Sequence, residues 1–266
     1  MADREPRRQV IVSRVFSAVV LASAALVATL AGGLAYLALI LVFAALVHWE
    51  LHRITRAPAM PWSFGVLAVC WAVAVLAWYG EVNTAWAVIP VAMAVALMTV
   101  IWRGGSPGWA IAGSFYVALP CAALGAIRLP GAEPVIWLFV VVWATDTGAY
   151  LVGRKVGGPK LWLRVSPGKT WSGAVGGLVI GTASGVGLMA WIGATPPGAG
   201  LVLLSAVLSV AAQLGDLLES AGKRAFNVKD SGSIIPGHGG VMDRLDSVIG
   251  AAVVLFMLQS FAGVSI

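Results

Sequence analysis

The chain has 266 residues, of which 60% are hydrophobic and 11% are charged, and its mean hydropathy is +0.93. This composition excludes a soluble globular domain and predicts a polytopic membrane protein. The net charge is +6, and the basic side chains stand in the connections between apolar stretches. We therefore attribute the basic excess to membrane topology and contact with anionic lipid, and we expect no nucleic-acid partner.

The first apolar stretch, from Val15 to Val47, contains no charged side chain. As one helix it would be about 50 Å long, whereas the hydrocarbon core of a bilayer is about 30 Å thick. The Gly32-Gly33 pair in its middle therefore predicts a turn between two helices. The same reasoning predicts an all-α integral membrane protein with about nine transmembrane helices. These spans are expected near Val15–Ala31, Leu34–Val47, Phe64–Tyr79, Trp86–Trp102, Trp109–Ile127, Val135–Val152, Gly173–Ile192, Leu201–Leu218 and Val248–Ala262.

The Lys and Arg residues test this count through the positive-inside rule. With a cytoplasmic N-terminus, nine spans place 16 of the 17 basic residues on the cytoplasmic side and only Arg128 on the other. We therefore expect nine spans in the cell membrane and a cytoplasmic N-terminus. The basic N-terminus also resembles a signal peptide, but the apolar run continues into a second span, so we interpret it as a retained first helix. Cys70 and Cys121 both lie in apolar spans, where we expect packing roles.

The two halves of the chain differ in where their acidic residues stand. Up to Pro134, the acids that follow the first span are Glu50, Glu81 and Glu133, at span ends or in loops. From Val135 onward, acids lie within or against apolar segments: Asp146, Asp216, Glu219, Asp243 and Asp246. A charged side chain in a membrane helix costs about 2.5–3.5 kcal/mol on insertion scales, so its presence indicates a function. We expect residues 1–134 to form a transmembrane scaffold and residues 135–266 to form a catalytic region with its site on the cytoplasmic face.

Asp146 lies in the segment WATDTGAYLVGRKVG, near the predicted cytoplasmic end of its span. It is either a ligand for a cation or substrate, or an acid paired with Arg154 or Lys155 at the interface.

The segment SPGKTWSG, from Ser166 to Gly173, precedes the seventh predicted span. It is not a Walker A motif, because Leu163 stands where that motif needs its first Gly. A Lys and hydroxyl groups in a Gly/Pro turn at a helix start suit phosphate binding through backbone N–H groups and the helix dipole. A capped helix start with topogenic charge is the alternative.

The third cluster surrounds the loop KDSGSIIPGHGG. Before the loop, Asp216, Glu219, Ser220 and Lys223 share one helix face, and after it Asp243, Asp246 and Ser247 repeat the same spacing. Two acidic helix faces beside a basic Gly-rich loop describe a Mg²⁺ site that faces a polyphosphate. His238 is either a structural hydrogen-bonding residue or a base. Zinc is not expected, because no second His or Cys stands at ligand spacing.

The stretch from Ser220 to Asp246, SAGKRAFNVKDSGSIIPGHGGVMDRLD, closely resembles the C-terminal signature of the phosphatidate cytidylyltransferase family. That pattern runs Ser-x-hydrophobic-Lys-Arg, four residues, Lys-Asp and, after a short spacer, His-Gly-Gly-x-x-Asp-Arg-x-Asp. GDLLES, SPGKTWSG and DTGAY also look like family motifs in the family's order. Gly222, Gly168 and Ser172 depart from the usual hydrophobic residue, Lys and Glu. The resemblance covers about Trp143 to Ser247.

This resemblance implies that CTP reacts with phosphatidate to give CDP-diacylglycerol and pyrophosphate. It implies that Asp216 and Asp243 hold Mg²⁺, and that Asp246 and Asp146 complete a site for a second cation. It also implies that the CTP triphosphate and the lipid phosphate are shared by Lys169, Lys223, Arg224, Lys229 and Arg244. The loop around the substrates would be shaped by His238, Gly239 and Gly240, with Ser166 and Thr170 as further substrate contacts.

Two other functions stay open at this point. One is a related membrane enzyme, either a lipid-alcohol kinase or a cytidylyltransferase acting on an isoprenoid-ether lipid. The other is an ion-coupled transporter, which is disfavoured because the intramembrane acids occupy one half of the chain and no internal repeat is visible. The oligomeric state is also open, a homodimer being one option.

Overall fold

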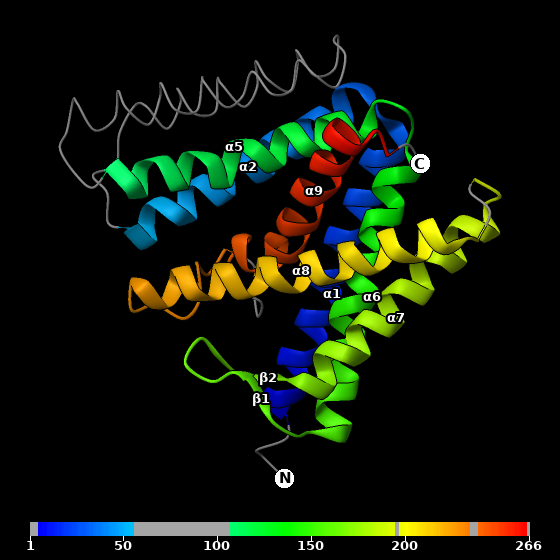
Figure 1. Cartoon of the computed structure of the whole chain (residues 1–266). Coiled ribbons are helices and arrows are strands. Elements are labelled where there is room, and N and C mark those ends of the chain that lie inside the picture. Colours follow the sequence, from blue (N-terminus) through cyan, green and yellow to red (C-terminus); the bar gives the residue numbers. More distant parts are fainter. Residues whose placement is uncertain (1–4, 56–106, 195–196, 235–238, 265–266) are drawn as a thin grey trace.

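The computed structural model describes residues 5–55, 107–194, 197–234 and 239–264. These residues form helices and one short hairpin (Figure 1). In chain order the elements are α1 Glu5–Ala31, α2 Gly33–Thr55, α5 Pro107–Arg128, α6 Glu133–Val156, β1 Lys160–Trp162, β2 Ser166–Thr170, α7 Trp171–Trp191, α8 Ala199–Ala225 and α9 Met242–Ala262.

The helices confirm a mostly helical membrane protein. Of the described helices, five are long and apolar enough to cross a membrane, namely α2, α6, α7, α8 and α9. Shorter apolar segments lie at Val15–Ala31 in α1 and Ala112–Arg128 in α5. All predicted spans in the described part of the chain fall on these helices, whereas those near Phe64–Tyr79 and Trp86–Trp102 lie outside it. The count of nine spans and the cytoplasmic N-terminus stay predictions.

The turn predicted at the Gly32-Gly33 pair separates α1 from α2. Both glycines have positive φ angles, 64° and 49°, which glycine adopts without the strain that a Cβ would cause. Arg128 Nε, at the end of α5, donates a 2.8 Å hydrogen bond to the carbonyl oxygen of Thr29. This bond satisfies an unpaired carbonyl at the end of α1. Arg128, which the predicted topology separates from the other basic residues, thus has a structural role.

Close packing of α6 against α7 fixes the part of α6 that carries Asp146. Gly173, Gly177, Gly181 and Gly185 form a buried stripe along α7, and a Cβ at Gly177 would come within 2.7 Å of the Thr145 carbonyl oxygen. Small residues let membrane helices approach closely in this way. The Thr145 hydroxyl, which lies against Gly181 of α7, donates a 2.8 Å hydrogen bond to Ser209 of α8. Thr145 therefore links three helices immediately before Asp146.

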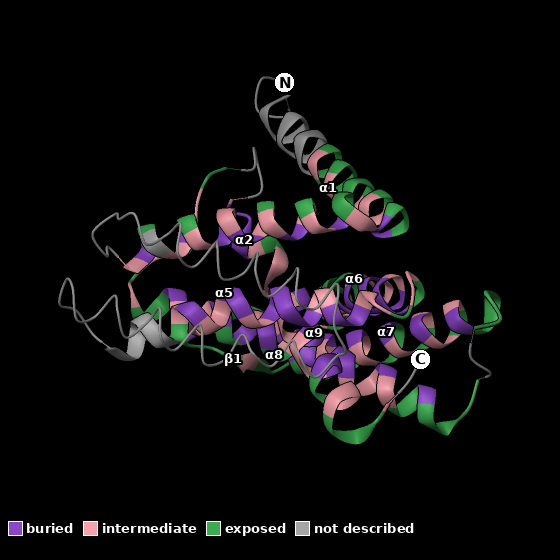
Figure 2. Cartoon of the chain, turned by 90° about the horizontal axis from the view of Figure 1, so that it is seen from above, coloured by how far each residue is buried: buried purple, intermediate pink, exposed green. Residues whose placement is uncertain are grey.

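The core gathers around α9, which contacts α2, α5, α6 and α8. In Figure 1 it lies between α8 and the α2–α5 pair, and Figure 2 shows buried residues concentrated where these helices meet. Large side chains such as Trp137, Leu255 and Phe256 are fully enclosed there. The core therefore fixes α9, and with it the acidic first turns of that helix.

A two-stranded hairpin corrects the all-helical prediction. β1 pairs antiparallel with β2, with Lys160 opposite Thr170. SPGKT is therefore a strand that runs directly into α7, rather than a turn. The predicted helix start itself is right, because the Thr170 hydroxyl accepts a 3.1 Å hydrogen bond from the Gly173 N–H and caps α7.

Candidate active site

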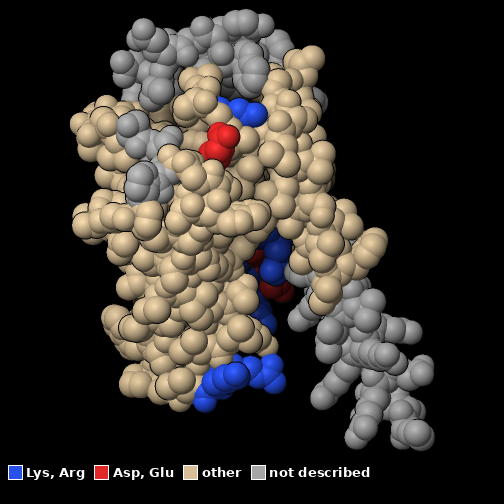
Figure 3. Space-filling view, turned by 90° about the vertical axis from the view of Figure 1, so that its right-hand side faces the viewer, with Lys and Arg blue, Asp and Glu red and all other residues tan. Residues whose placement is uncertain are grey.

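A polar cleft of about 720 Å³ lies among α6, the hairpin, α8 and α9. Its walls bring together charged residues that are distant in the sequence: Asp146, Lys169, Asp216, Asp243, Arg244 and Asp246. Thr170 also lines it. In Figure 3, acidic and basic side chains lie together inside a hollow, and other charged groups are visible near the upper and lower ends of this face. The two motifs and the acidic helix faces that the sequence singled out thus meet in one place.

An apolar pocket of about 420 Å³ adjoins this cleft and is lined by α1, α2, α5, α6 and α9. Its walls include Leu21, Leu39, Phe43, Leu124 and Phe139. The polar cleft and the apolar pocket share four charged residues, which are Asp146, Asp243, Arg244 and Asp246. A molecule with an apolar tail in the pocket would therefore present its polar end to the same groups that face the cleft.

Three of the four carboxylates that line the cleft come from three different helices. Asp216 of α8 forms an ion pair with Lys169 of β2 and accepts a 3.4 Å hydrogen bond from Ser220. Asp146 of α6 accepts a 3.2 Å hydrogen bond from the Ser247 hydroxyl, and Asp246 accepts a 2.7 Å hydrogen bond from the Ser247 N–H. Ser247 thus connects the acid of α6 with the acid of α9.

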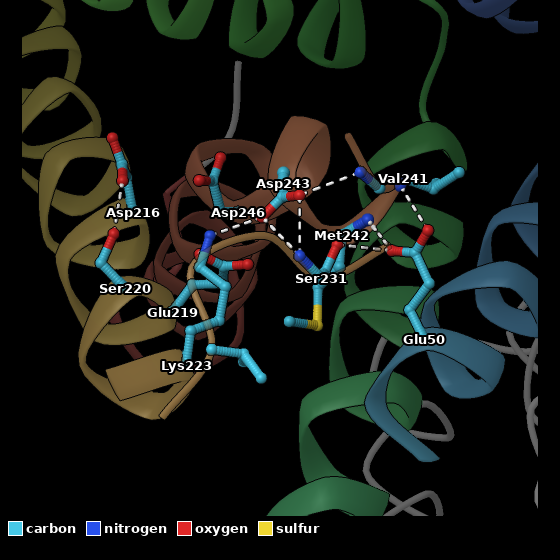
Figure 4. Close-up of polar contacts among 12 residues, drawn as sticks. Glu50, Asp216, Glu219, Ser220, Lys223, Ser231, Val241, Met242, Asp243 and Asp246 are labelled. Carbon is cyan, nitrogen blue, oxygen red and sulfur yellow. Dashed lines mark hydrogen bonds and ion pairs between the residues drawn. The ribbon is translucent and has the colours of Figure 1, made fainter. Parts of the chain in front are cut away.

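Asp243 has a different environment, because protein groups surround its carboxylate (Figure 4). Its oxygens accept hydrogen bonds from the N–H groups of Ser231, at 3.0 Å, and Gly240, at 2.9 Å. They also pair with Lys223, whose Nζ lies 2.7 Å from Glu219. Lys223 and Glu219 are buried, with side chains 10% and 1% exposed. As placed, Lys223 neutralises two acids.

Glu50 of α2 is a member of this network that the sequence did not single out. Its side chain is fully buried and accepts hydrogen bonds from the Ser231 hydroxyl at 2.7 Å and from the N–H groups of Val241 and Met242 at 2.8 Å each. The apolar run ends at Val47, so Glu50 was expected at a span end, whereas α2 continues to Thr55. Glu50 could have been identified from the sequence if the helix had been predicted to continue past the apolar run, because Glu50 would then be an acid inside a membrane helix. Glu219 stood on a predicted polar face but received no role.

Other predicted residues lie elsewhere. Arg224 donates a 2.9 Å hydrogen bond to the Val228 carbonyl oxygen and a 3.4 Å bond to that of Val165, so it ties the loop to the hairpin. Ser166 and Lys229 are not among the residues that line the cleft or the pocket, and Lys229 is exposed. His238 lies outside the described residues.

The two glycines that follow His238 allow the loop to approach Asp243. Gly239 has a φ angle of 85°, and a Cβ there would come within 2.9 Å of Asp243 Oδ2. A Cβ at Gly240 would collide with the side chains of Ser231 and Glu50. Both glycines therefore support the site through the shape of the loop.

The donor set is suited to a hard cation. Within the described residues, no three Asp, Glu, His or Cys side chains converge closely enough to hold a metal ion by themselves. Mg²⁺, however, binds through one or two protein carboxylates and takes its other ligands from water and phosphate oxygens. Asp146, Asp216, Asp243 and Asp246 could serve a cation of this kind together with a phosphate ligand.

Comparison with known proteins agrees with this chemistry. A profile of the cytidylyltransferase family matches residues 12–262. Phosphatidate cytidylyltransferase of Brucella suis biovar 1 is 38% identical over 256 residues, which cover 92% of each chain. Enzymes of the same name from Staphylococcus haemolyticus and Bacillus subtilis are 44% and 45% identical over 132 and 129 residues, about half of each chain. The chain therefore belongs to the cytidylyltransferase family.

Proposed function

We propose that this protein is a phosphatidate cytidylyltransferase, which converts CTP and phosphatidate into CDP-diacylglycerol and pyrophosphate. The observation that carries the proposal is the junction of the apolar pocket and the polar cleft at Asp146, Asp243, Arg244 and Asp246. Acyl chains in the pocket would bring the lipid phosphate to the groups that face a triphosphate in the cleft. The names of the relatives support the same substrates.

In this reaction an oxygen of the lipid phosphate attacks the α-phosphorus of CTP. A new P–O bond forms, the bond between the α-phosphorus and its bridging oxygen breaks, and pyrophosphate leaves with the electron pair. The attacking phosphate is already anionic near neutral pH, so the site needs alignment and charge neutralisation rather than a strong base. The walls described above offer the cations Lys169 and Arg244 for this purpose.

The ion pair between Lys169 and Asp216 suggests how the nucleotide enters. A triphosphate in the cleft would compete with Asp216 for the Lys169 ammonium group. Lys169 would then neutralise phosphate charge, and Asp216 would become available to another cation. Both side chains are partly exposed to the cleft, at 28% and 26%, so the exchange requires no rearrangement of the core.

We further propose that the reaction depends on Mg²⁺, held by Asp216 and Asp243, with Asp246 and Asp146 available to a second cation. A carboxylate offers about four acceptor positions, and each oxygen of Asp243 already has two contacts, because the Ser231 N–H is shared between both oxygens. A metal ion at Asp243 would therefore replace one of these contacts, such as one half of the shared Ser231 N–H. When bound, Mg²⁺ would neutralise phosphate charge that develops as pyrophosphate leaves.

The finer topology belongs to this proposal as well. Nine spans with a cytoplasmic N-terminus would place 16 of the 17 basic residues, and every site motif, on the cytoplasmic side of the cell membrane. CTP is cytosolic, so the site would open where the nucleotide is available.

The test uses purified protein in detergent micelles with phosphatidate and Mg²⁺. CTP labelled at the α-phosphate should transfer its label to the lipid-extractable fraction only when phosphatidate and Mg²⁺ are both present. CTP labelled at the γ-phosphate, supplied with a lipid alcohol, should transfer none. Transfer of the γ-label would instead establish a lipid-alcohol kinase. If folded protein transferred neither label, the proposed reaction would be wrong, and ion flux into sealed vesicles would then test transport.

A further inference from the structure

We infer that Glu50 is a positioning residue of the active site: from the first half of the chain it holds the loop that carries Ser231 and Gly240, and thereby sets the position of Asp243. This inference rests on the proposed role of Asp243. It assigns to α2 a function that the division into scaffold and catalytic regions does not include.

Both oxygens of Glu50 are in use. Oε1 accepts the Val241 N–H at 2.8 Å, and Oε2 accepts the Met242 N–H at 2.8 Å and the Ser231 hydroxyl at 2.7 Å. Figure 4 shows the carboxylate reaching from α2 toward this short backbone segment. Hydrogen bonds to an ionised acceptor are shorter and stronger than those between neutral groups. A fully buried carboxylate with three donors is therefore a firm attachment point.

Glu50 also caps α9 from outside that helix. The residue at the N-cap position is Val241, whose side chain has no acceptor for the first N–H groups of the helix. The Glu50 carboxylate supplies that acceptor, and its negative charge lies at the positive end of the helix dipole. The start of α9, and hence the direction in which Asp243 leaves it, depends on a residue of α2.

The glycines of the loop are shaped around the same carboxylate. A Cβ at Gly232 would come within 2.8 Å of Glu50 Oε1. A Cβ at Gly240 would come too close to Glu50 Oε2 and to the Ser231 hydroxyl. Gly232 and Gly240 thus both leave room for the Glu50 side chain. The loop and Glu50 fit each other in shape as well as in hydrogen bonding.

Asp243 holds the same backbone segment from the other side. The Gly240 N–H points to Asp243, whereas the next N–H, that of Val241, points to Glu50. Ser231 likewise divides its donors, with its N–H bound to Asp243 and its hydroxyl to Glu50. A shift of Glu50 would therefore move the two N–H groups that orient Asp243. The contacts run from α2 through the loop to the cleft.

The test is Glu50→Gln, compared with Glu133→Gln as a matched control because Glu133 is an exposed acid on α6. The Gln amide has the same shape, but it replaces one acceptor with a donor that faces an N–H or a hydroxyl. We expect kcat per folded enzyme to fall by about 100-fold, the effect of an ångström-scale misplacement at a reacting centre. The KM values for CTP and phosphatidate should change far less, and amide hydrogen exchange at residues 240–242 should become faster.

Ser231→Ala provides a second test that keeps α2 and Glu50 intact. It removes one of the three donors, so we expect a smaller loss of kcat in the same direction. The double variant should lose less than the product of the two single effects, because both act on one network.

An unchanged kcat per folded molecule in Glu50→Gln would overturn the inference, even with faster exchange, because Glu50 would then be a structural tie alone. If Glu50→Gln does not fold, an unchanged kcat in Ser231→Ala overturns it instead. Wild-type protein assayed in parallel separates this result from the proposed function: wild-type protein that lacks transfer activity contradicts the reaction, whereas active wild-type protein with an equally active variant contradicts the role of Glu50.

Discussion

Glu50 of α2 and Asp216 of α8 are both acids on long apolar helices, and their surroundings differ. Glu50 is fully enclosed, and each of its oxygens accepts hydrogen bonds from the loop. Asp216 is 26% exposed, lines the polar cleft and pairs with Lys169 across it. An acid in an apolar helix is costly in either setting. What surrounds the carboxylate indicates whether it holds the fold in place or remains available to a substrate or cation.

The same comparison qualifies the division of the chain into two parts. The boundary at residue 134 stays a prediction, but α1, α2 and α5 all line the apolar pocket, and α2 contacts the signature loop through Glu50. The first half thus contributes walls and an attachment point, and the second half contributes the charged groups of the cleft. Four predictions test this contrast between enclosed and available groups.

The largest effect is expected for Asp243, which is enclosed on one side and faces the cleft on the other. Asp243→Asn should abolish label transfer while the protein stays folded in the membrane, because the substitution removes the charge that would hold Mg²⁺. Removal of one preorganised electrostatic group typically costs about 10²–10³-fold in rate. The rate at which Asp243→Asn transfers label from the α-phosphate of CTP to lipid is the measurement. Rates near wild type would contradict the metal assignment.

The second prediction separates available acids from enclosed ones. Asp216→Asn should raise the Mg²⁺ concentration for half-maximal activity at least about tenfold, since changes to the outer shell of a metal alone cost that much. The free energy of unfolding of Asp216→Asn should change by less than about 1 kcal/mol, because this variant loses a partly exposed ion pair.

Glu50→Gln should instead lower the free energy of unfolding by about 1–3 kcal/mol, because buried donors lose their acceptor. Thermal unfolding in detergent compares Asp216→Asn with Glu50→Gln. Equal losses of stability in both variants would contradict the distinction between an available and an enclosed acid.

Much of this arrangement could be predicted from the sequence. Apolar runs and the Gly32-Gly33 pair predict the helices well, since a membrane requires long apolar segments. The helix ends were less accurate, because α2 and α8 continue beyond their apolar parts to Thr55 and Ala225. The hairpin was missed because its strands are only three and five residues long and include Pro and Gly.

The site was predictable where its members are close in the sequence. The spacing of Asp216, Ser220 and Lys223 indicates one helix face, and the structure shows contacts along it. Glu50 was not predictable in this way, since its partners are 181 to 192 residues away in the chain. Residue spacing along one sequence does not show that Glu50 meets a loop so far away in the chain. The contact of Lys223 with Asp243 of α9 was not predictable for the same reason, and the phosphate role that the family resemblance implies for Lys223 stays a prediction.

The third prediction concerns Lys169, which pairs with Asp216. Lys169→Ala should raise the KM for CTP by about 10–100-fold, because a hydrogen bond to a charged group contributes about 1.5–3 kcal/mol. The KM for phosphatidate should stay unchanged, since Lys169 lines the polar cleft and is not among the residues of the apolar pocket. Steady-state kinetics with each substrate varied in turn provide the measurement. An unchanged dependence on CTP would remove Lys169 from the nucleotide site.

The smallest effect concerns the pocket wall that α2 provides. Leu39 lines the apolar pocket and is partly buried, so Leu39→Trp should narrow the space for an acyl chain. A change of about one methylene group in an apolar pocket alters binding by about 1–3 kcal/mol, and we expect a shift at the lower end because Leu39 is one of many residues that line the pocket. The KM for phosphatidate should therefore rise about fivefold to tenfold, with the KM for CTP unchanged.

Leu34→Trp is the matched control for Leu39→Trp, because Leu34 lies on the same helix, is 84% exposed and is not among the residues of the pocket. It should leave both KM values at the wild-type level. A higher KM for phosphatidate in both variants would indicate a general disturbance of α2. An unchanged KM in both variants would mean that the acyl chains bind elsewhere. A rise in Leu39→Trp alone would show that α2 contributes to lipid binding as well as holding the loop through Glu50, so that one helix of the first half serves both substrates' sites.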